Sequence, residues 1–151
     1  MTGVSNGLPS AVLFACTMYS IRSVMAAGIL KWLHGTRIYV DSVGVRKGEP
    51  DGFAIEVMDE IGIDISRHRP RTFEELDDDN FDLVISLSPE AQHRAVEMTR
   101  TFACEVEFWR TFDPSILEGS REMRLDGYRQ VRDELMKRLK ARFPAVSTPR
   151  L

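Results

Sequence analysis

Cysteine is scarce in this chain, with only Cys16 and Cys104 among 151 residues. Two cysteines cannot build a disulfide framework, and a reactive thiol is best kept in a reducing compartment, so we expect a cytoplasmic protein. The three histidines are scattered, and no spacing of His, Cys, Asp and Glu resembles a metal site. We therefore expect no metal and no other cofactor.

Long apolar runs and an excess of positive charge are also lacking. No stretch reaches the length that spans a membrane, and the first ten residues lack the basic start and apolar centre of a signal peptide. The formal net charge of -3 offers no electrostatic attraction to nucleic acid or to a membrane surface. We therefore expect neither nucleic acid nor a membrane as a partner.

The length of the chain suits one domain with a full hydrophobic core, and no low-complexity linker divides it. We expect a disordered N-terminal tail over residues 1–10, one domain over 11–143 and a C-terminal tail over 144–151.

Segments with strand and helix character alternate along this domain. Strands are expected at 11–15, 37–43, 81–87 and 104–109, and helices at 23–33, 52–61, 89–101 and 121–143, with a short helix at 72–75. Strands separated by helices imply a parallel sheet that is covered on both sides. The predicted fold is therefore α/β: a single domain with a four-stranded parallel sheet flanked on both faces by helices.

The stretch from Cys16 to Arg22 is the most informative motif. It connects the first expected strand to the first expected helix and places five residues between the thiol and the guanidinium. Backbone N–H groups of such a loop can point inward and hold an anion at the helix N-terminus, beyond the carboxyl end of the strand. We predict an oxyanion-binding loop made of Thr17, Met18, Tyr19, Ser20, Ile21, Arg22 and Ser23.

Three side chains in this motif suit nucleophilic chemistry on the bound anion. Arg22 has a planar fork that can hold two oxygens, and Ser23 can donate a hydrogen bond to a thiolate. Helix N-termini and nearby cations lower the pKa of a cysteine to roughly 3.5–7.5, so we expect Cys16 to be an ionised nucleophile. The alternative is a small buried hydrophobic cysteine, but the strand, loop and helix around it favour a functional role.

A departing alkoxide or phenolate needs a proton, and Asp113 is the candidate acid. It follows the fourth expected strand on the same edge of the sheet as Cys16 and precedes Pro114. An ordinary Asp-Pro turn is the alternative explanation for this dipeptide.

Six segments together resemble the low-molecular-weight protein tyrosine phosphatase superfamily, which also contains arsenate reductases. They are CTMYSIRS from Cys16, DSVG from Asp41, ISRHRPR from Ile65, FDLVISLS from Phe81, FWRTFDP from Phe108 and YRQVRDEL from Tyr128. The resemblance implies a cysteinyl-phosphate intermediate on Cys16, with Arg22 as phosphate ligand, Ser23 as thiolate partner and Asp113 as general acid. It also implies that Ser42 and His68 form a hydrogen-bonded pair that holds the loop.

The loop departs from the family pattern at four places. Met18, Tyr19, Ser20 and Ile21 stand where the family usually has Gly, Asn, an apolar residue and a second Cys. After Pro114 the chain continues SILEG, without the aromatic residues with which many members hold a phosphotyrosine ring.

Three functions fit these features. The leading hypothesis is a hydrolase of phosphotyrosine or small aryl phosphomonoesters, whose partners are a phosphorylated protein or a small phosphomonoester, with inorganic phosphate, vanadate or arsenate as oxyanion ligands. The second is an arsenate reductase that uses an external thiol such as glutathione, because no cysteine follows FDLVISLS closely enough to relay a disulfide. The third is a catalytically weak module that binds phosphate or a phosphoprotein.

Overall fold

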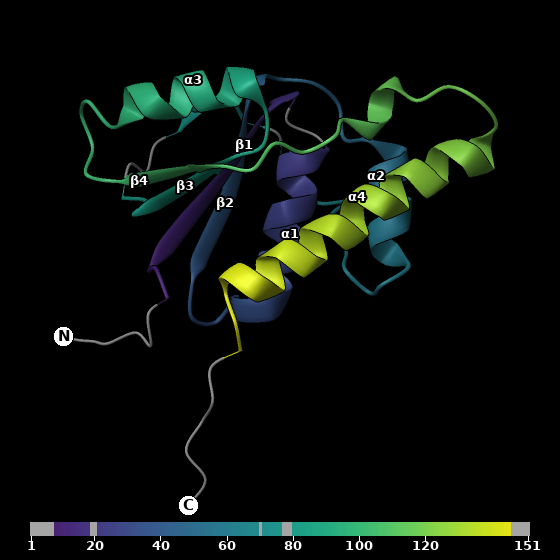
Figure 1. Cartoon of the computed structure of the whole chain (residues 1–151), viewed down its shortest axis with the longest axis horizontal. Coiled ribbons are helices and arrows are strands. Elements are labelled where there is room, and N and C mark those ends of the chain that lie inside the picture. Colours follow the sequence, from purple (N-terminus) through teal and green to yellow (C-terminus); the bar gives the residue numbers. More distant parts are fainter. Residues whose placement is uncertain (1–7, 19–20, 70, 77–79, 146–151) are drawn as a thin grey trace, which may run out of the picture.

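Four parallel strands form one sheet in the computed structural model, which describes residues 8–18, 21–69, 71–76 and 80–145 (Figure 1). The strands are β1 (Ala11–Met18), β2 (Tyr39–Arg46), β3 (Leu83–Ser86) and β4 (Glu105–Phe108). Their order is β2-β1-β3-β4, so β1 and β3 are central and each neighbouring pair is parallel.

Helices cover both faces of this sheet. They are α1 (Arg22–His34), α2 (Gly52–Asp59), α3 (Pro89–Met98) and α4 (Arg121–Arg142), with short 3-10 turns η1 (Phe73–Glu75) and η2 (Pro114–Ile116). Figure 1 shows α3 on one side of the sheet and α1, α2 and α4 on the other. The predicted single-domain α/β fold with four parallel strands is confirmed. Parts of the tails expected at 1–10 and 144–151 lie outside the described residues, so these tails stay predictions.

The central strand β1 carries the cysteine of the motif, and its side chains alternate between the two layers. Val12, Phe14 and Cys16 belong to the core formed with α1 and α4, whereas Leu13 and Ala15 belong to the core beneath α3. All five are completely buried, as expected for a central strand covered on both faces. Cys16 therefore points toward the layer that contains α1.

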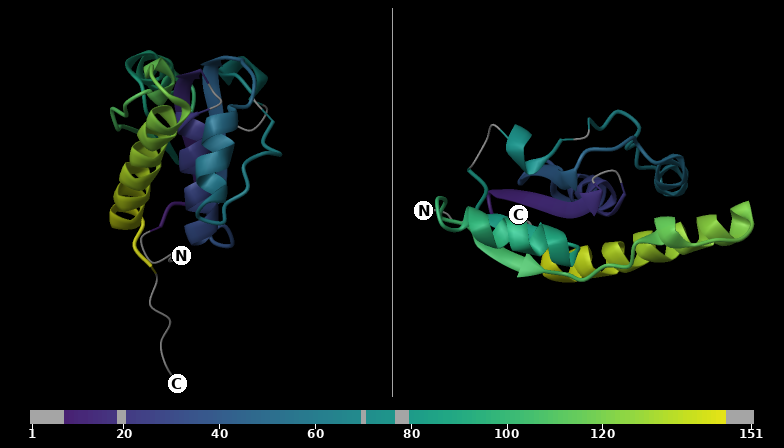
Figure 2. Two further views of the ribbon diagram at one scale, coloured as in Figure 1. Left: turned by 90° about the vertical axis from the view of Figure 1, so that its right-hand side faces the viewer. Right: turned by 90° about the horizontal axis from the view of Figure 1, so that it is seen from above.

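The longest helix, α4, packs against both α1 and α2, and the three helices lie side by side in the left view of Figure 2. Leu135 and Leu139 are among the fully buried residues of its apolar face. On the same side of the helix, Arg132 donates to the Val57 carbonyl and to the Glu60 carboxylate, both at 2.8 Å. These contacts fix the C-terminal end of α2 against α4.

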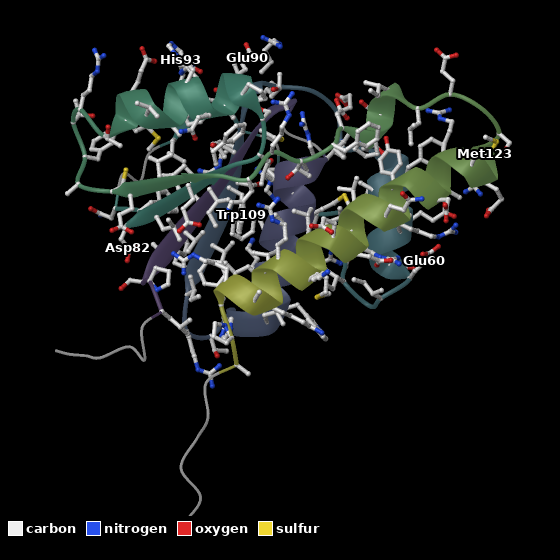
Figure 3. All side chains as sticks on the ribbon, in the orientation of Figure 1. Glu60, Asp82, Glu90, His93, Trp109 and Met123 are labelled. Carbon is white, nitrogen blue, oxygen red and sulfur yellow. The ribbon has the colours of Figure 1, made fainter. Side chains whose placement is uncertain are left out.

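Glu60, labelled in Figure 3, accepts hydrogen bonds from Arg129 as well. The hydrogen bonds from Arg129 lower the pKa of Glu60 most. Burial opposes them, but the hydrogen bond from Arg132 and the charges of both arginines lower the pKa further, to about 2. The Glu60 carboxylate therefore stays ionised at any ordinary pH.

Strand β1 is three residues longer than the strand expected at 11–15. Sequence character predicts its end at residue 15, but β1 continues to Met18 because β2 runs beside it, pairing Cys16 with Gly44 and Met18 with Arg46. Two residues of the expected loop, Thr17 and Met18, therefore belong to the sheet. Tyr19 and Ser20 of that loop lie outside the described residues.

Within the part of the chain that the structure describes, no helix combines the length and the apolar character that crossing a bilayer requires.

We expect Leu135→Ala to lower the free energy of unfolding by about 2–5 kcal/mol, because removal of a fully buried leucine side chain leaves a cavity in the core that α4 shares with α1. The matched control is Met123→Ala in the same helix, where the side chain is 64% exposed and the change should stay within about 0.5 kcal/mol. Urea unfolding followed by circular dichroism measures both. Equal losses in the two variants would contradict the packing of α4.

Candidate active site

Cys16, Arg22, Ser23 and Asp113 meet at the carboxyl end of the sheet. The Cys16 thiol donates to the Ser23 hydroxyl at 3.1 Å, and both residues are completely buried. Arg22, the first residue of α1, is 7% exposed. Its Nη1 donates to the carbonyl of Thr111 at 3.0 Å, and its Nη2 lies 3.9 Å from Oδ2 of Asp113. The thiol, the cation and the carboxylate predicted from separate segments are therefore brought together.

Burial raises the pKa of Cys16 above its ordinary value. Hydrogen bonds with Ser23 and the positive charge of Arg22 lower it, and the negative charge of Asp113 raises it, but burial dominates. The expectation of a thiolate in the unliganded protein is therefore wrong. The sequence predicted the nearby cation and the helix N-terminus, but not the complete loss of solvent around the sulfur.

Asp113 forms the Asp-Pro turn that was the alternative explanation, and its carboxylate also faces the candidate site; its role as an acid stays a prediction. Its Oδ1 accepts from the backbone N–H of Ser115 at 3.0 Å and from the Ser115 hydroxyl at 2.7 Å, which caps η2 as an Asp-Pro turn does. Its Oδ2 faces Arg22. The turn thus fixes Asp113 through Oδ1 and leaves Oδ2 directed at the Arg22 guanidinium.

The first residue of the expected loop is tied to the neighbouring helix. The Thr17 hydroxyl donates to Ser88 at 2.8 Å, and the same Ser88 oxygen accepts from the backbone N–H of Ala91 as the N-cap of α3. At the other end of the loop, Ile21 is buried and precedes α1 without a side-chain cap. The side chain of Met18, like Tyr19 and Ser20, lies outside the described residues, so the predicted cradle of N–H groups stays a prediction.

Ser42 and His68 form the hydrogen-bonded pair that the resemblance implied. The Ser42 hydroxyl and Nε2 of His68 are 2.9 Å apart. Burial lowers the pKa of His68, and the charge of Lys31 lowers it further, so the imidazole favours its neutral form. That this pair holds the oxyanion loop stays a prediction.

Sequence reasoning gave too little weight to Asp51. Its Oδ1 caps α2 by accepting from the Ala54 N–H at 3.0 Å, and its Oδ2 accepts from the buried hydroxyl of Tyr128 at 3.0 Å. Burial raises the pKa of Tyr128, and the charges of Asp51 and Asp113 raise it further. A second carboxylate therefore lies near the candidate acid. In the sequence, the Asp51-Gly52 pair before an apolar helix indicates the cap. It gives no sign of the hydrogen bond from Tyr128, which comes from a distant part of the chain.

Among the described residues, no three His, Cys, Asp or Glu side chains gather in a way that could hold a metal ion.

Residues 11–148 match the low molecular weight phosphotyrosine protein phosphatase family. The chain belongs to this family. The arsenate reductase of Bacillus subtilis (strain 168) is 35% identical over 132 residues, which cover 85% of this chain and 91% of that protein.

Two solved structures show the same fold at similar identity. One, an arsenate reductase in the phosphate binding state, is 30% identical with a TM-score of 0.68, covering 87% of this chain and 95% of its own. The other, the low molecular weight protein tyrosine phosphatase of T. tengcongensis, is 28% identical with a TM-score of 0.69, covering 85% and 93%. The family resemblance is confirmed, and both reductases and phosphatases are similar to this chain.

We expect alkylation of Cys16 by iodoacetamide to accelerate with pH through about 9 without a plateau near neutrality, because burial raises the pKa of the thiol. The measurement uses a Cys104→Ser background, in which Cys16 is the remaining cysteine, and mass spectrometry to follow its rate. Adding Ser23→Ala should slow alkylation at a fixed pH near 8, since the hydrogen bonds of Ser23 lower that pKa. A rate that levels off below about pH 7 would contradict the neutral thiol.

Proposed function

We propose that this protein is a phosphatase that hydrolyses phosphotyrosine or small aryl phosphomonoesters through a cysteinyl-phosphate on Cys16. The supporting observation is the buried Arg22 guanidinium, which lies beside the Asp113 carboxylate at the start of α1, the helix that follows the strand with Cys16. This arrangement supports the proposal because the guanidinium could bind the anion and the carboxyl group could protonate the leaving oxygen, both close to the Cys16 thiol.

Arg22 is oriented for bidentate binding. Because the Thr111 carbonyl takes Nη1, two phosphoryl oxygens would be held by Nε and Nη2. The N-terminus of α1 adds partial positive charge at the same place. A phosphoryl group bound in this way would lie next to Asp113, which faces Nη2.

A neutral thiol is compatible with this chemistry when the substrate is a phosphate dianion. The proton of the Cys16 sulfur passes to a phosphoryl oxygen, and the resulting thiolate attacks phosphorus. Asp113 takes up a proton from solvent before this step. The phosphorus–oxygen ester bond then breaks as the Asp113 carboxyl group gives that proton to the leaving oxygen. Water then attacks the cysteinyl-phosphate and gives a proton to the Asp113 carboxylate. Cys16 leaves as a thiolate that the Ser23 hydroxyl can stabilise.

The position of Cys104 argues against an internal thiol relay. Leu83 pairs with both Val12 and Glu105, so Cys104 lies about five residues, or roughly 16 Å, below Cys16 along the strand direction and about 10 Å across two strands. A disulfide needs Cα atoms within about 7 Å. Because the chain has no third cysteine, electrons for a reductase would have to come from another molecule.

An arsenate reductase that uses an external thiol is the second candidate, favoured by the similarity to the Bacillus subtilis enzyme. Cys16 would displace hydroxide from arsenate to form a sulfur–arsenic bond. Attack of a glutathione thiolate on the cysteine sulfur would then release arsenite with the bonding electron pair and leave a mixed disulfide. A second glutathione would restore the thiol.

Phosphatase activity is tested with p-nitrophenyl phosphate and phenyl phosphate. Cys16→Ser should abolish hydrolysis of both. Asp113→Asn should lower kcat by about 100-fold or more on phenyl phosphate, and less on p-nitrophenyl phosphate, whose leaving group needs a proton less. Asp59→Asn, at the exposed far end of α2, is the control and should keep full activity.

Unchanged hydrolysis in Cys16→Ser would end the phosphatase proposal. Binding of vanadate to the wild-type protein without turnover of either ester would instead identify a binding module.

Arsenate reduction is tested separately, by following arsenite formation with glutathione. If the second candidate is correct, Cys104→Ser should reduce arsenate at the wild-type rate, because Cys104 lies too far from Cys16 to take part. Mass spectrometry of the wild-type protein after arsenate and glutathione should show a glutathione adduct on Cys16. A disulfide between Cys16 and Cys104 would contradict the distance argument.

A further inference from the structure

Thr111 lies on the segment between β4 and η2, and its carbonyl is the group that accepts from Arg22. We propose that the Thr111 hydroxyl is a positioning group for Arg22: by bending the backbone back onto Trp109, it aims the Thr111 carbonyl at the guanidinium. This inference rests on the proposed oxyanion site. It assigns a role to a side chain that does not touch the anion.

Three hydrogen bonds define the backbone at Thr111. Its N–H donates to the Leu87 carbonyl at 3.1 Å, its Oγ1 donates to the Trp109 carbonyl at 2.7 Å, and its own carbonyl accepts from Arg22. Leu87 in turn donates to the carbonyl of Ala15, the residue before Cys16. A continuous series of hydrogen bonds therefore connects Arg22, through Thr111 and Leu87, to the strand that carries the thiol.

Packing alone does not fix this segment. On its far side, a cavity of about 540 Å³ separates it from α4, with Phe112 and Leu117 on one wall and Val131 and Arg138 on the other. Phe112 is 52% exposed. Figure 3 shows Trp109 near the C-terminal half of α4, where Arg138 lies over its ring, and Met123 at the N-terminal end of that helix. With open space behind it, the segment depends on its hydrogen bonds to keep its shape.

The burial of Thr111 gives the hydroxyl its importance. The residue is 8% exposed, so removal of its hydroxyl would take from the Trp109 carbonyl a hydrogen bond that is made inside the protein. The backbone between Trp109 and Phe112 could then rotate, and the Thr111 carbonyl would turn away from Nη1 of Arg22. A buried guanidinium without this partner would no longer present Nε and Nη2 to an oxyanion.

The experiment measures binding of inorganic phosphate by calorimetry and inhibition by vanadate. Thr111→Val keeps the shape of the side chain but removes the hydroxyl, and it should weaken phosphate binding about 5- to 10-fold. Thr111→Ser restores the hydroxyl and should bind within about twofold of wild type. The control is Thr99→Val, which removes a similar bond, 2.6 Å to the Val96 carbonyl, at the exposed end of α3 and should change nothing.

A second comparison shows whether Thr111 acts through Arg22. In an Arg22→Lys background, Thr111→Val should weaken phosphate binding less than about twofold, since the planar guanidinium that the carbonyl orients is gone. A purely structural defect would cause the same loss in both backgrounds and would overturn the inference. If Thr111→Val does not fold, Thr111→Ala takes its place in both backgrounds.

Binding and turnover separate this inference from the proposed function. Phosphate binding that weakens in Thr111→Val, in a wild-type protein that hydrolyses no ester, supports the inference while the phosphatase proposal fails. Equal phosphate affinity in Thr111→Val and wild type overturns the inference even if hydrolysis is observed. A wild-type protein that binds neither phosphate nor vanadate overturns both.

Discussion

The buried guanidinium of Arg22 is the interaction around which the candidate site is organised. A cation that is 7% exposed has lost nearly all of its water, so protein groups must replace it. The Thr111 carbonyl and the Asp113 carboxylate do so, and they come from the segment that follows β4, about ninety residues away along the chain. The start of α1 and the exit from β4 must therefore meet at one point, which the shared parallel sheet makes possible.

The same loss of water governs the thiol. Burial favours the neutral form of Cys16, and the hydrogen bonds of Ser23 and the charge of Arg22 oppose it only in part. The negative charge of Asp113 raises the pKa of Cys16, as burial does. Within the site, one cation lies beside one carboxylate, and burial favours the neutral form of the sulfur, so the net charge is small. An entering dianion would bring the negative charge that the unliganded thiol does not carry, as well as an oxygen able to take the proton.

Features that depend on neighbours in sequence were predictable, and those that depend on distant segments were not. Ser88 and Pro89 begin α3 as a capping serine and a first-turn proline should, and Thr72 and Glu75 form their capping box. The pairing of Ser42 with His68 followed from family resemblance. The contribution of Thr111 had no sequence signal, because it comes from a main-chain carbonyl. The extension of β1 to Met18 depends on the length of its neighbour β2, which periodicity within β1 cannot reveal.

The extension of β1 also determines what can move during a reaction. Because Cys16 is paired with Gly44 inside the ladder, its backbone belongs to the most constrained part of the molecule. The backbone of the candidate nucleophile is thus held in place, so a reacting group would have to move toward the sulfur. Rotation about the bond from Cα to Cβ of Cys16 is the one freedom the sulfur retains. A substrate would therefore have to be positioned against the sulfur by the groups that bind it, rather than by movement of the strand.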